Sequence, residues 1–123
     1  MAFFSVIIPL YNKENHIENT LKSVLNQTFQ DFEIIIIEDC STDDSKKKAE
    51  SFLFEKIKII QHEKNKGLSA SRNTGIENSN SSFLAFLDAD DIWHKNYLEK
   101  IFELIQNHYL LKVESIKEEF EQL

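Results

Sequence analysis

The chain has 123 residues and a mass of 14.4 kDa, which is the usual size of one domain with one hydrophobic core. Its 14 basic and 21 acidic residues give a net charge of −7 and a pI of about 5.1, which argues against a nucleic acid or an anionic lipid as partner. A hydrophobic fraction of 41% and a charged fraction of 28% are typical of a globular protein and exclude a disordered chain.

Cysteine usage and hydropathy indicate the compartment. Cys40 is the single cysteine and has no partner for an internal disulfide, and the four histidines are not spaced like zinc ligands. No apolar run approaches the ~20 residues of a membrane span, and the N-terminus lacks the basic region of a secretory signal. We therefore predict a cytoplasmic protein without a transmembrane segment, either free or peripheral to the inner membrane face.

Short apolar runs alternate with segments of helical spacing. The predicted strands are residues 3–8, 32–37, 57–60 and 82–87, and the predicted helices begin at Glu14 and span 46–54 and 68–78. We expect the first strand to stop at Pro9, and we expect Ser41, with Asp44 three residues later, to cap the second helix. This alternation predicts a three-layer α/β/α, Rossmann-like fold with a mainly parallel sheet.

The C-terminal segment has a helical pattern of its own. Beyond Lys95 the apolar positions recur every three or four residues up to Leu123, without an intervening glycine or proline. One long amphipathic helix fits this pattern, and so does a helix ending near Asn107 followed by an extended piece over 109–113 and a second short helix. We divide the chain into a domain at 1–109 and a helical tail at 110–123, which offers a coiled-coil contact for a homodimer.

Ligands of parallel sheets bind where the strands' carboxyl ends meet the loops, and acidic residues collect there. The fourth strand is followed by Asp88-Ala89-Asp90-Asp91, three carboxylates within four residues. Hard oxygen ligands at this spacing suit Mg²⁺ or Mn²⁺. The structural alternative is an acidic turn that caps the next helix.

Three further residues are candidates for binding. The segment from Asn65 to Gly75 contains both glycines and the only arginine, Arg72, whose planar guanidinium suits a phosphate or carboxylate, although a structural ion pair explains it equally well. Asp39 follows the second strand, where an acid commonly accepts hydrogen bonds from a ribose or base, or caps a helix. Tyr11 either stacks on a base or covers the sheet edge.

Taken together, these segments resemble the nucleotide-sugar-binding N-terminal half of a family 2 glycosyltransferase with the GT-A fold, over roughly Phe3 to Ile101. The matching segments are 5–12, 38–45, 65–75 and 88–91, and the last is similar to the DXD motif of the family. The resemblance implies transfer of a sugar from a nucleotide-diphosphate sugar, with UDP as the expected nucleotide. It also implies a saccharide or a lipid-linked acceptor.

The resemblance also assigns residues. The implied nucleotide contacts are Pro9, Tyr11, Asp39, Arg72, Asp88 and Ala89. Among these, Pro9 and Tyr11 would line the base pocket, and Asp39 would hydrogen-bond the base. The implied ligands of the divalent cofactor, Mn²⁺ or Mg²⁺, are Asp90 and Asp88, and the metal would neutralise charge on the departing nucleoside diphosphate.

The chain also departs from the family pattern. Cys40 stands where the family usually has glycine, so we expect a steric penalty and an altered loop if the backbone there has a positive φ. Enzymes of the family usually continue past the DXD motif into a half that binds the acceptor and supplies the catalytic base, and we recognise no such site here, so no catalytic residue is assigned. The alternative function is a non-catalytic nucleotide-binding or interaction module derived from this fold.

Two other α/β classes fit the sequence less well. A receiver domain places an acidic pair after its first strand, and a Rossmann dehydrogenase places a glycine-rich turn there. This chain has Pro9-Leu10-Tyr11-Asn12 at that position. We therefore disfavour both classes.

Overall fold

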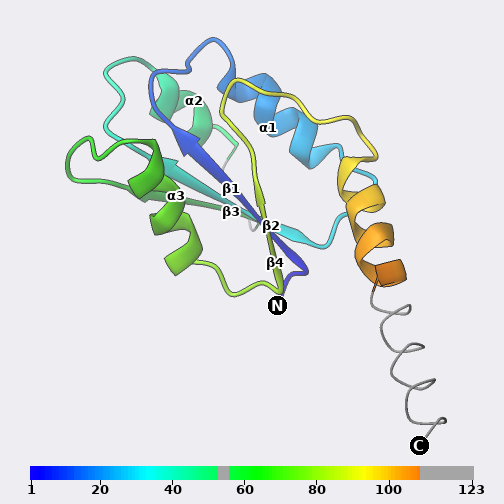
Figure 1. The fold of residues 1–123 in the computed structure, drawn as a ribbon. Helices are drawn as coiled ribbons and strands as arrows, with labels where there is room; N and C mark the ends of the chain where they lie inside the picture. The colour runs from blue at the N-terminus through cyan, green and yellow to red at the C-terminus, as the bar shows by residue number, and fades with distance from the viewer. Residues whose placement is uncertain (53–55, 109–123) are drawn as a thin grey trace, which may run out of the picture.

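The computed structural model describes residues 1–52 and 56–108. Its strands are β1 (Phe4–Leu10), β2 (Phe32–Glu38), β3 (Ile57–Gln61) and β4 (Phe83–Phe86). Its helices are α1 (Ile17–Leu25), α2 (Ser45–Glu50) and α3 (Leu68–Glu77), followed by helical backbone over residues 97–108. All strand pairs are parallel, and the sheet has the order β3-β2-β1-β4 (Figure 1).

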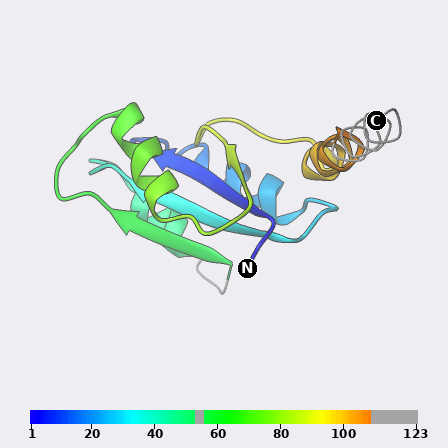
Figure 2. The same ribbon diagram turned by 60° about the horizontal axis from the view of Figure 1, so that its bottom comes forward.

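The two central strands separate two layers of helices. Side chains alternate across a strand, so even-numbered residues such as Val6 and Ile34 join the core that contains residues of α1, α2 and the helix at 97–108. Ile7, Ile35 and Ile37 form a smaller core on the opposite face, which α3 covers (Figure 2). The predicted three-layer α/β architecture is confirmed, because both faces of the parallel sheet are covered.

Helix α3 lies unusually close to β1. Its buried residues are small, Ser71 and Gly75, and a Cβ atom added at Gly75 would collide with Cγ2 of Ile7. Glycine at this position therefore lets the helix approach the strand.

The prediction that the first strand stops at Pro9 is wrong, because β1 continues to Leu10. In a parallel strand the N–H and C=O groups of one residue point to the same neighbour. Ile7 faces β4, since its carbonyl accepts from the N–H of Leu87, and Leu10 faces β2, since its carbonyl accepts from Asp39. Pro9 therefore faces the β4 side beyond Phe86, the last residue of β4, where the missing N–H breaks no ladder bond.

The predicted cap of the second helix is also wrong. The helix α2 begins at Ser45, and the N–H of Ser45 donates to Asp43 Oδ1 at 2.9 Å. Ser41 is engaged elsewhere, because its Oγ accepts from the N–H of Asn12 at 3.0 Å. Ser41 therefore contacts Asn12, in the loop after β1, and does not form the local capping box.

The helix at 97–108 is attached to the sheet by apolar contacts. Leu98 is fully buried, and the Phe102 ring lies 4.9 Å from that of Phe3 and 4.8 Å from that of Phe29. Among the helices described, none is long and apolar enough to cross a membrane. The structure describes no residue beyond 108. The predicted tail at 110–123 and the homodimer contact therefore lie outside the described residues, and so does most of the segment that follows the alternative break after Asn107.

Candidate functional site

A cavity of about 400 Å³ opens at the carboxyl edge of the sheet, between β1, β2, the start of α3 and the loop after β4. The predicted site residues that line it are Pro9, Tyr11, Asp39, Asp88, Ala89 and Asp90. Leu10, Lys13, Asn65, Gly67, Leu68 and Ser71 complete the wall. The structure thus brings together six of the seven residues that the sequence singled out for nucleotide and metal.

Asp39 lines this cavity just after β2, and we call this part the inner end because Asp39 is only 3% exposed. Its Oδ1 accepts from Nδ1 of His62 at 2.8 Å and from the N–H of Lys66 at 2.8 Å, and its Oδ2 accepts from the N–H of Gly67 at 2.9 Å. Burial raises the pKa of Asp39, but these donors outweigh it and hold the pKa below its ordinary value. Asp39 is therefore an ionised, fixed acceptor, and its Oδ2 accepts one bond from the described residues.

His62 is held from both sides. Its Nε2 lies 2.8 Å from Oγ1 of Thr74, on α3, and the ring is 6% exposed in the interior behind Asp39. The hydrogen bonds from His62, Lys66 and Gly67 thus join β2, the loop before α3 and α3 itself. They fix the position of the Asp39 carboxylate relative to the cavity.

Hydrogen bonds also join the loops after β1 and β2. The N–H of Lys13 donates to Ser45 Oγ at 2.7 Å, and the N–H of Glu14 donates to Asp43 Oδ2 at 3.2 Å. Burial raises the pKa of Asp43, but donors from Ser45 and Glu14 lower it below its ordinary value. The two loops therefore form one rigid wall.

Cys40 lies in the loop after β2 with φ of +62°, so it occupies the left-handed region that glycine favours. Its thiol donates to the carbonyl oxygen of His62 at 3.1 Å. The expected steric penalty applies to this backbone. Glycine would adopt this backbone conformation without that penalty.

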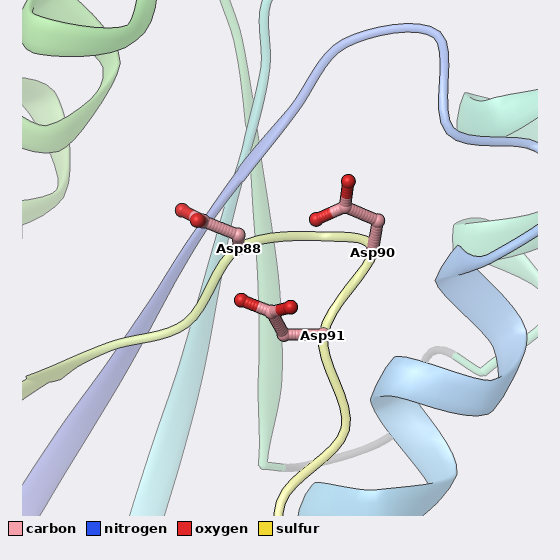
Figure 3. Close-up of side chains that lie close together, drawn as sticks. All are labelled: Asp88, Asp90 and Asp91. Atoms are coloured by element: carbon pink, nitrogen blue, oxygen red, sulfur yellow. The ribbon is translucent and has the colours of Figure 1, made fainter.

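Three carboxylates project from the loop after β4, those of Asp88, Asp90 and Asp91 (Figure 3). One oxygen from each lies within 4.8 Å of the others, and all three residues are exposed. Exposed side chains can rotate, and carboxylate oxygens are the donors that Mg²⁺ and Mn²⁺ prefer. The residues present therefore fit a divalent cation, and Asp91 joins the two ligands named from the sequence.

The backbone of this acidic loop is anchored to α1. The buried Oγ1 of Thr20 donates toward the carbonyl oxygens of Ala89 and Asp91, at 2.9 and 2.7 Å. Farther along, Nε2 of Gln27 donates to the carbonyl oxygen of His94 at 2.7 Å. The main chain of the loop is thus fixed, whereas its three carboxylates are exposed.

Two cationic side chains contact the acidic loop. Nζ of Lys13 lies 3.3 Å from Asp90 Oδ2, and Arg72 Nη2 lies 3.5 Å from Asp88 Oδ1. Arg72 does not line the main cavity but a neighbouring hollow on the other side of Asp88, together with Phe86 and Trp93. The structure thus places Arg72 beside the predicted site rather than in its wall.

Sequence reasoning did not single out Lys13, His62, Thr20 or Gln27. Lys13 could have been found, because it follows the first strand within the loop already under consideration. The other three act through contacts between residues distant in sequence, for which a single sequence carries no signal.

Comparison with known proteins identifies the family. The sequence profile of "Glycosyl transferase family 2" matches residues 5–119, so the chain belongs to this family. It is 38% identical over 105 residues to UDP-Glc:alpha-D-GlcNAc-diphosphoundecaprenol beta-1,3-glucosyltransferase WfgD of Escherichia coli, covering 85% of this chain and 42% of the relative. It is 43% identical over 108 residues to minor teichoic acid biosynthesis protein GgaA of Bacillus subtilis (strain 168), and this match covers 81% of this chain and 24% of the relative. The chain therefore spans less than half the length of these relatives.

Solved structures confirm the GT-A fold. The crystal structure of S. aureus TarS 1–349 in complex with UDP-GlcNAc matches with a TM-score of 0.82 and 34% identity, covering 86% of this chain and 32% of that one. The same protein in complex with UDP matches with a TM-score of 0.80. The mannosyltransferase PcManGT of Pyrobaculum calidifontis, in complex with GDP-Man and Mn²⁺, matches with a TM-score of 0.68 at 22% identity and bears on the fold alone.

Proposed function

We propose that this chain is the donor-binding part of a glycosyltransferase and that its cavity holds the nucleotide of a UDP-sugar. The observation that carries the proposal is the cavity itself, which has a fixed buried acceptor, Asp39, at one end and a cluster of exposed carboxylates at the other. The UDP and UDP-GlcNAc complexes of TarS support the choice of nucleotide, as does the UDP-Glc in the name of WfgD.

The inner end suits the base. An ionised carboxylate accepts hydrogen bonds but donates none, so Asp39 selects a base edge that presents an N–H. Tyr11 is 44% exposed at the wall of the cavity, where its ring is available to stack on the base, and Pro9 adds an apolar contact. Asp39, Tyr11 and Pro9 thereby orient the nucleoside so that its diphosphate points to the acidic loop.

The outer end suits the diphosphate with its metal. In this proposal Asp88 and Asp90, joined by Asp91, hold Mn²⁺ or Mg²⁺, and Ala89 and Asp88 lie against the nucleotide. A divalent cation there would act as a Lewis acid that stabilises the leaving diphosphate. The chain's own contribution is position, because Thr20 fixes the loop from which the carboxylates reach.

The remaining parts of the reaction are expectations for the whole protein. The acceptor is a saccharide or a lipid-linked saccharide, as the diphosphoundecaprenol in the name of WfgD suggests. The site of action is cytoplasmic, either free or at the inner membrane face. A non-catalytic module is less favoured, because the relatives named above include a glucosyltransferase and the cavity retains both acidic ends.

Calorimetric titration with UDP, in the presence of Mn²⁺ and then of a chelator, tests the proposal. We expect binding that requires the metal and exceeds that of GDP and ADP. In Asp90→Asn the affinity for UDP with Mn²⁺ should fall at least about tenfold, because losing a direct metal ligand costs no less than losing a residue that only supports a ligand. Metal-independent binding, or equal binding by Asp90→Asn, would contradict the metal assignment. Absence of UDP binding in the wild type would contradict the donor site.

A further inference from the structure

We propose that Lys13 is a ligand of the donor's diphosphate, and that it exchanges its present partner, Asp90, for phosphate oxygens when Asp90 turns to the metal. This inference rests on the proposed donor site and adds a residue to it. Lys13 is the third residue after β1 and lines the cavity.

The charge balance of the cavity favours such a cation. Its wall contains the carboxylates of Asp39, Asp88 and Asp90, whereas among the residues described Lys13 is the only cationic side chain that lines it. A nucleoside diphosphate is itself an anion, so carboxylates alone would repel it. A divalent cation offsets part of this repulsion, and an ammonium group in the wall offsets more.

The present contact of Lys13 is easily exchanged. Its Nζ lies 3.3 Å from Asp90 Oδ2, and the two side chains are 41% and 42% exposed. Ion pairs in such exposed positions are weak. A divalent cation attracts a carboxylate more strongly than an ammonium group does, so Asp90 would leave Lys13 for the metal, and Lys13 would be free to bind the phosphate.

The backbone of Lys13 is anchored, whereas its side chain is 41% exposed. Its N–H donates to Ser45 Oγ at 2.7 Å, and its carbonyl oxygen accepts from the N–H groups of His16 and Ile17 at 3.0 and 2.9 Å. The Cα atom is thus anchored both to the start of α2 and to the first turn of α1. A flexible side chain on an anchored backbone can move between two partners within one cavity.

Arg72 does not fill the same role. It is the other cationic side chain found beside the acidic loop, but it contacts Asp88 from the neighbouring hollow and does not line the cavity. Lys13 and Arg72 therefore contact different carboxylates of the acidic loop, Asp90 and Asp88 respectively. Only Lys13 shares a wall with Tyr11 and Asp39, where the nucleotide is proposed to lie.

The test compares Lys13→Gln with Lys46→Gln, which removes a similarly exposed lysine of α2 that pairs with Glu50 at 3.9 Å. For UDP with Mn²⁺, Lys13→Gln should lose about tenfold or more in affinity, the range of a hydrogen bond to a charged group, whereas Lys46→Gln should not change. Uridine has no phosphate for Lys13 to contact, so Lys13→Gln and the wild type should bind it equally well. Lys13→Arg should regain most of the lost UDP affinity, because it retains the charge.

A second measurement uses Mn²⁺ alone. Removing the competing ammonium group should let Lys13→Gln bind Mn²⁺ more tightly, by up to about fivefold, the strength of an exposed ion pair. Equal UDP affinity in Lys13→Gln and wild type would overturn the assignment of Lys13 while leaving the donor site intact. If the wild type binds no UDP, the donor site and this inference are both overturned.

Discussion

Asp39 and the acidic loop line one cavity, and they follow β2 and β4, which lie on either side of β1 in the sheet. The Asp39 carboxylate is buried and accepts three hydrogen bonds from the chain. The side chains of Asp88 and Asp90 are 52% and 42% exposed, and their partners among the described residues are one exposed cation each. At the loop the main chain is fixed instead, by Thr20.

In the donor site that we propose, this difference corresponds to two kinds of recognition. A base offers few donors at fixed positions, so a rigid acceptor is suited to distinguish one base from another. A metal with a diphosphate must be able to enter and leave, so its carboxylates need freedom to rearrange. The same residue type, aspartate, therefore serves stability at one end of the cavity and exchange at the other.

The same substitution at the two ends should separate these roles. Asp39→Asn should lower the free energy of unfolding by about 3 kcal/mol. The hydrogen bonds to the charged carboxylate are lost, and the side-chain amide group of asparagine places its own N–H donors against a buried N–H group. Asp90→Asn should change it by less than about 0.5 kcal/mol. Urea unfolding followed by circular dichroism measures both, and equal effects would show that the two ends do not differ as described.

Acid should remove part of the stability that the Asp39 carboxylate provides. The pKa of Asp39 is lower in the folded than in the unfolded chain, so its carboxylate stabilises the fold above the unfolded value of about 3.9, and this stability is lost as pH falls through the folded pKa. Asp43 acts in the same direction. The stability difference between wild type and Asp39→Asn should therefore shrink below about pH 4, and a constant difference from pH 7 to pH 3 would refute the account.

A smaller effect is expected where α3 packs on β1. A methyl group in Gly75→Ala collides with Ile7, and overpacking of this kind typically costs about 1–3 kcal/mol, offset by up to ~1 kcal/mol of helix propensity. We expect a net loss of about 1 kcal/mol. A double variant with Ile7→Ala should be more stable than the sum of the single effects predicts, and strict additivity would show that the two residues do not collide.

Much of the fold was predictable because its signals are local. The apolar runs of β1 and β2 are buried on both faces, so each reads as a strand without any knowledge of its partners. The rule that ligands bind at the carboxyl edge then placed Asp39 and Asp90 in one cavity. The prediction failed where a contact with a residue distant in sequence determines the local structure. At Ser41 the hydroxyl group accepts from the N–H of Asn12 instead of capping a helix.

The residues that line the candidate site were largely predictable, but their burial and hydrogen bonding were not. Nothing near Asp39 in the sequence indicates that His62 and the N–H groups of Lys66 and Gly67 surround its carboxylate. Arg72 was placed at the nucleotide by resemblance, and the structure puts it beside the cavity. Burial and hydrogen bonding depend on how loops distant in sequence meet. These two properties distinguish the buried carboxylate of Asp39 from the exposed carboxylates of the acidic loop.

The most direct test of the two-ended donor site is a nuclear magnetic resonance titration of the isotope-labelled chain with UDP and Mg²⁺, followed by traces of Mn²⁺. The account predicts that UDP with Mg²⁺ shifts the amide signals of Tyr11, Lys66 and Gly67 together with those of the acidic loop at 88–91. Mn²⁺ should then broaden the signals of the acidic loop and Lys13 while leaving Lys66 and Gly67 sharper. Shifts confined to another surface, or broadening centred on Asp39, would contradict the account.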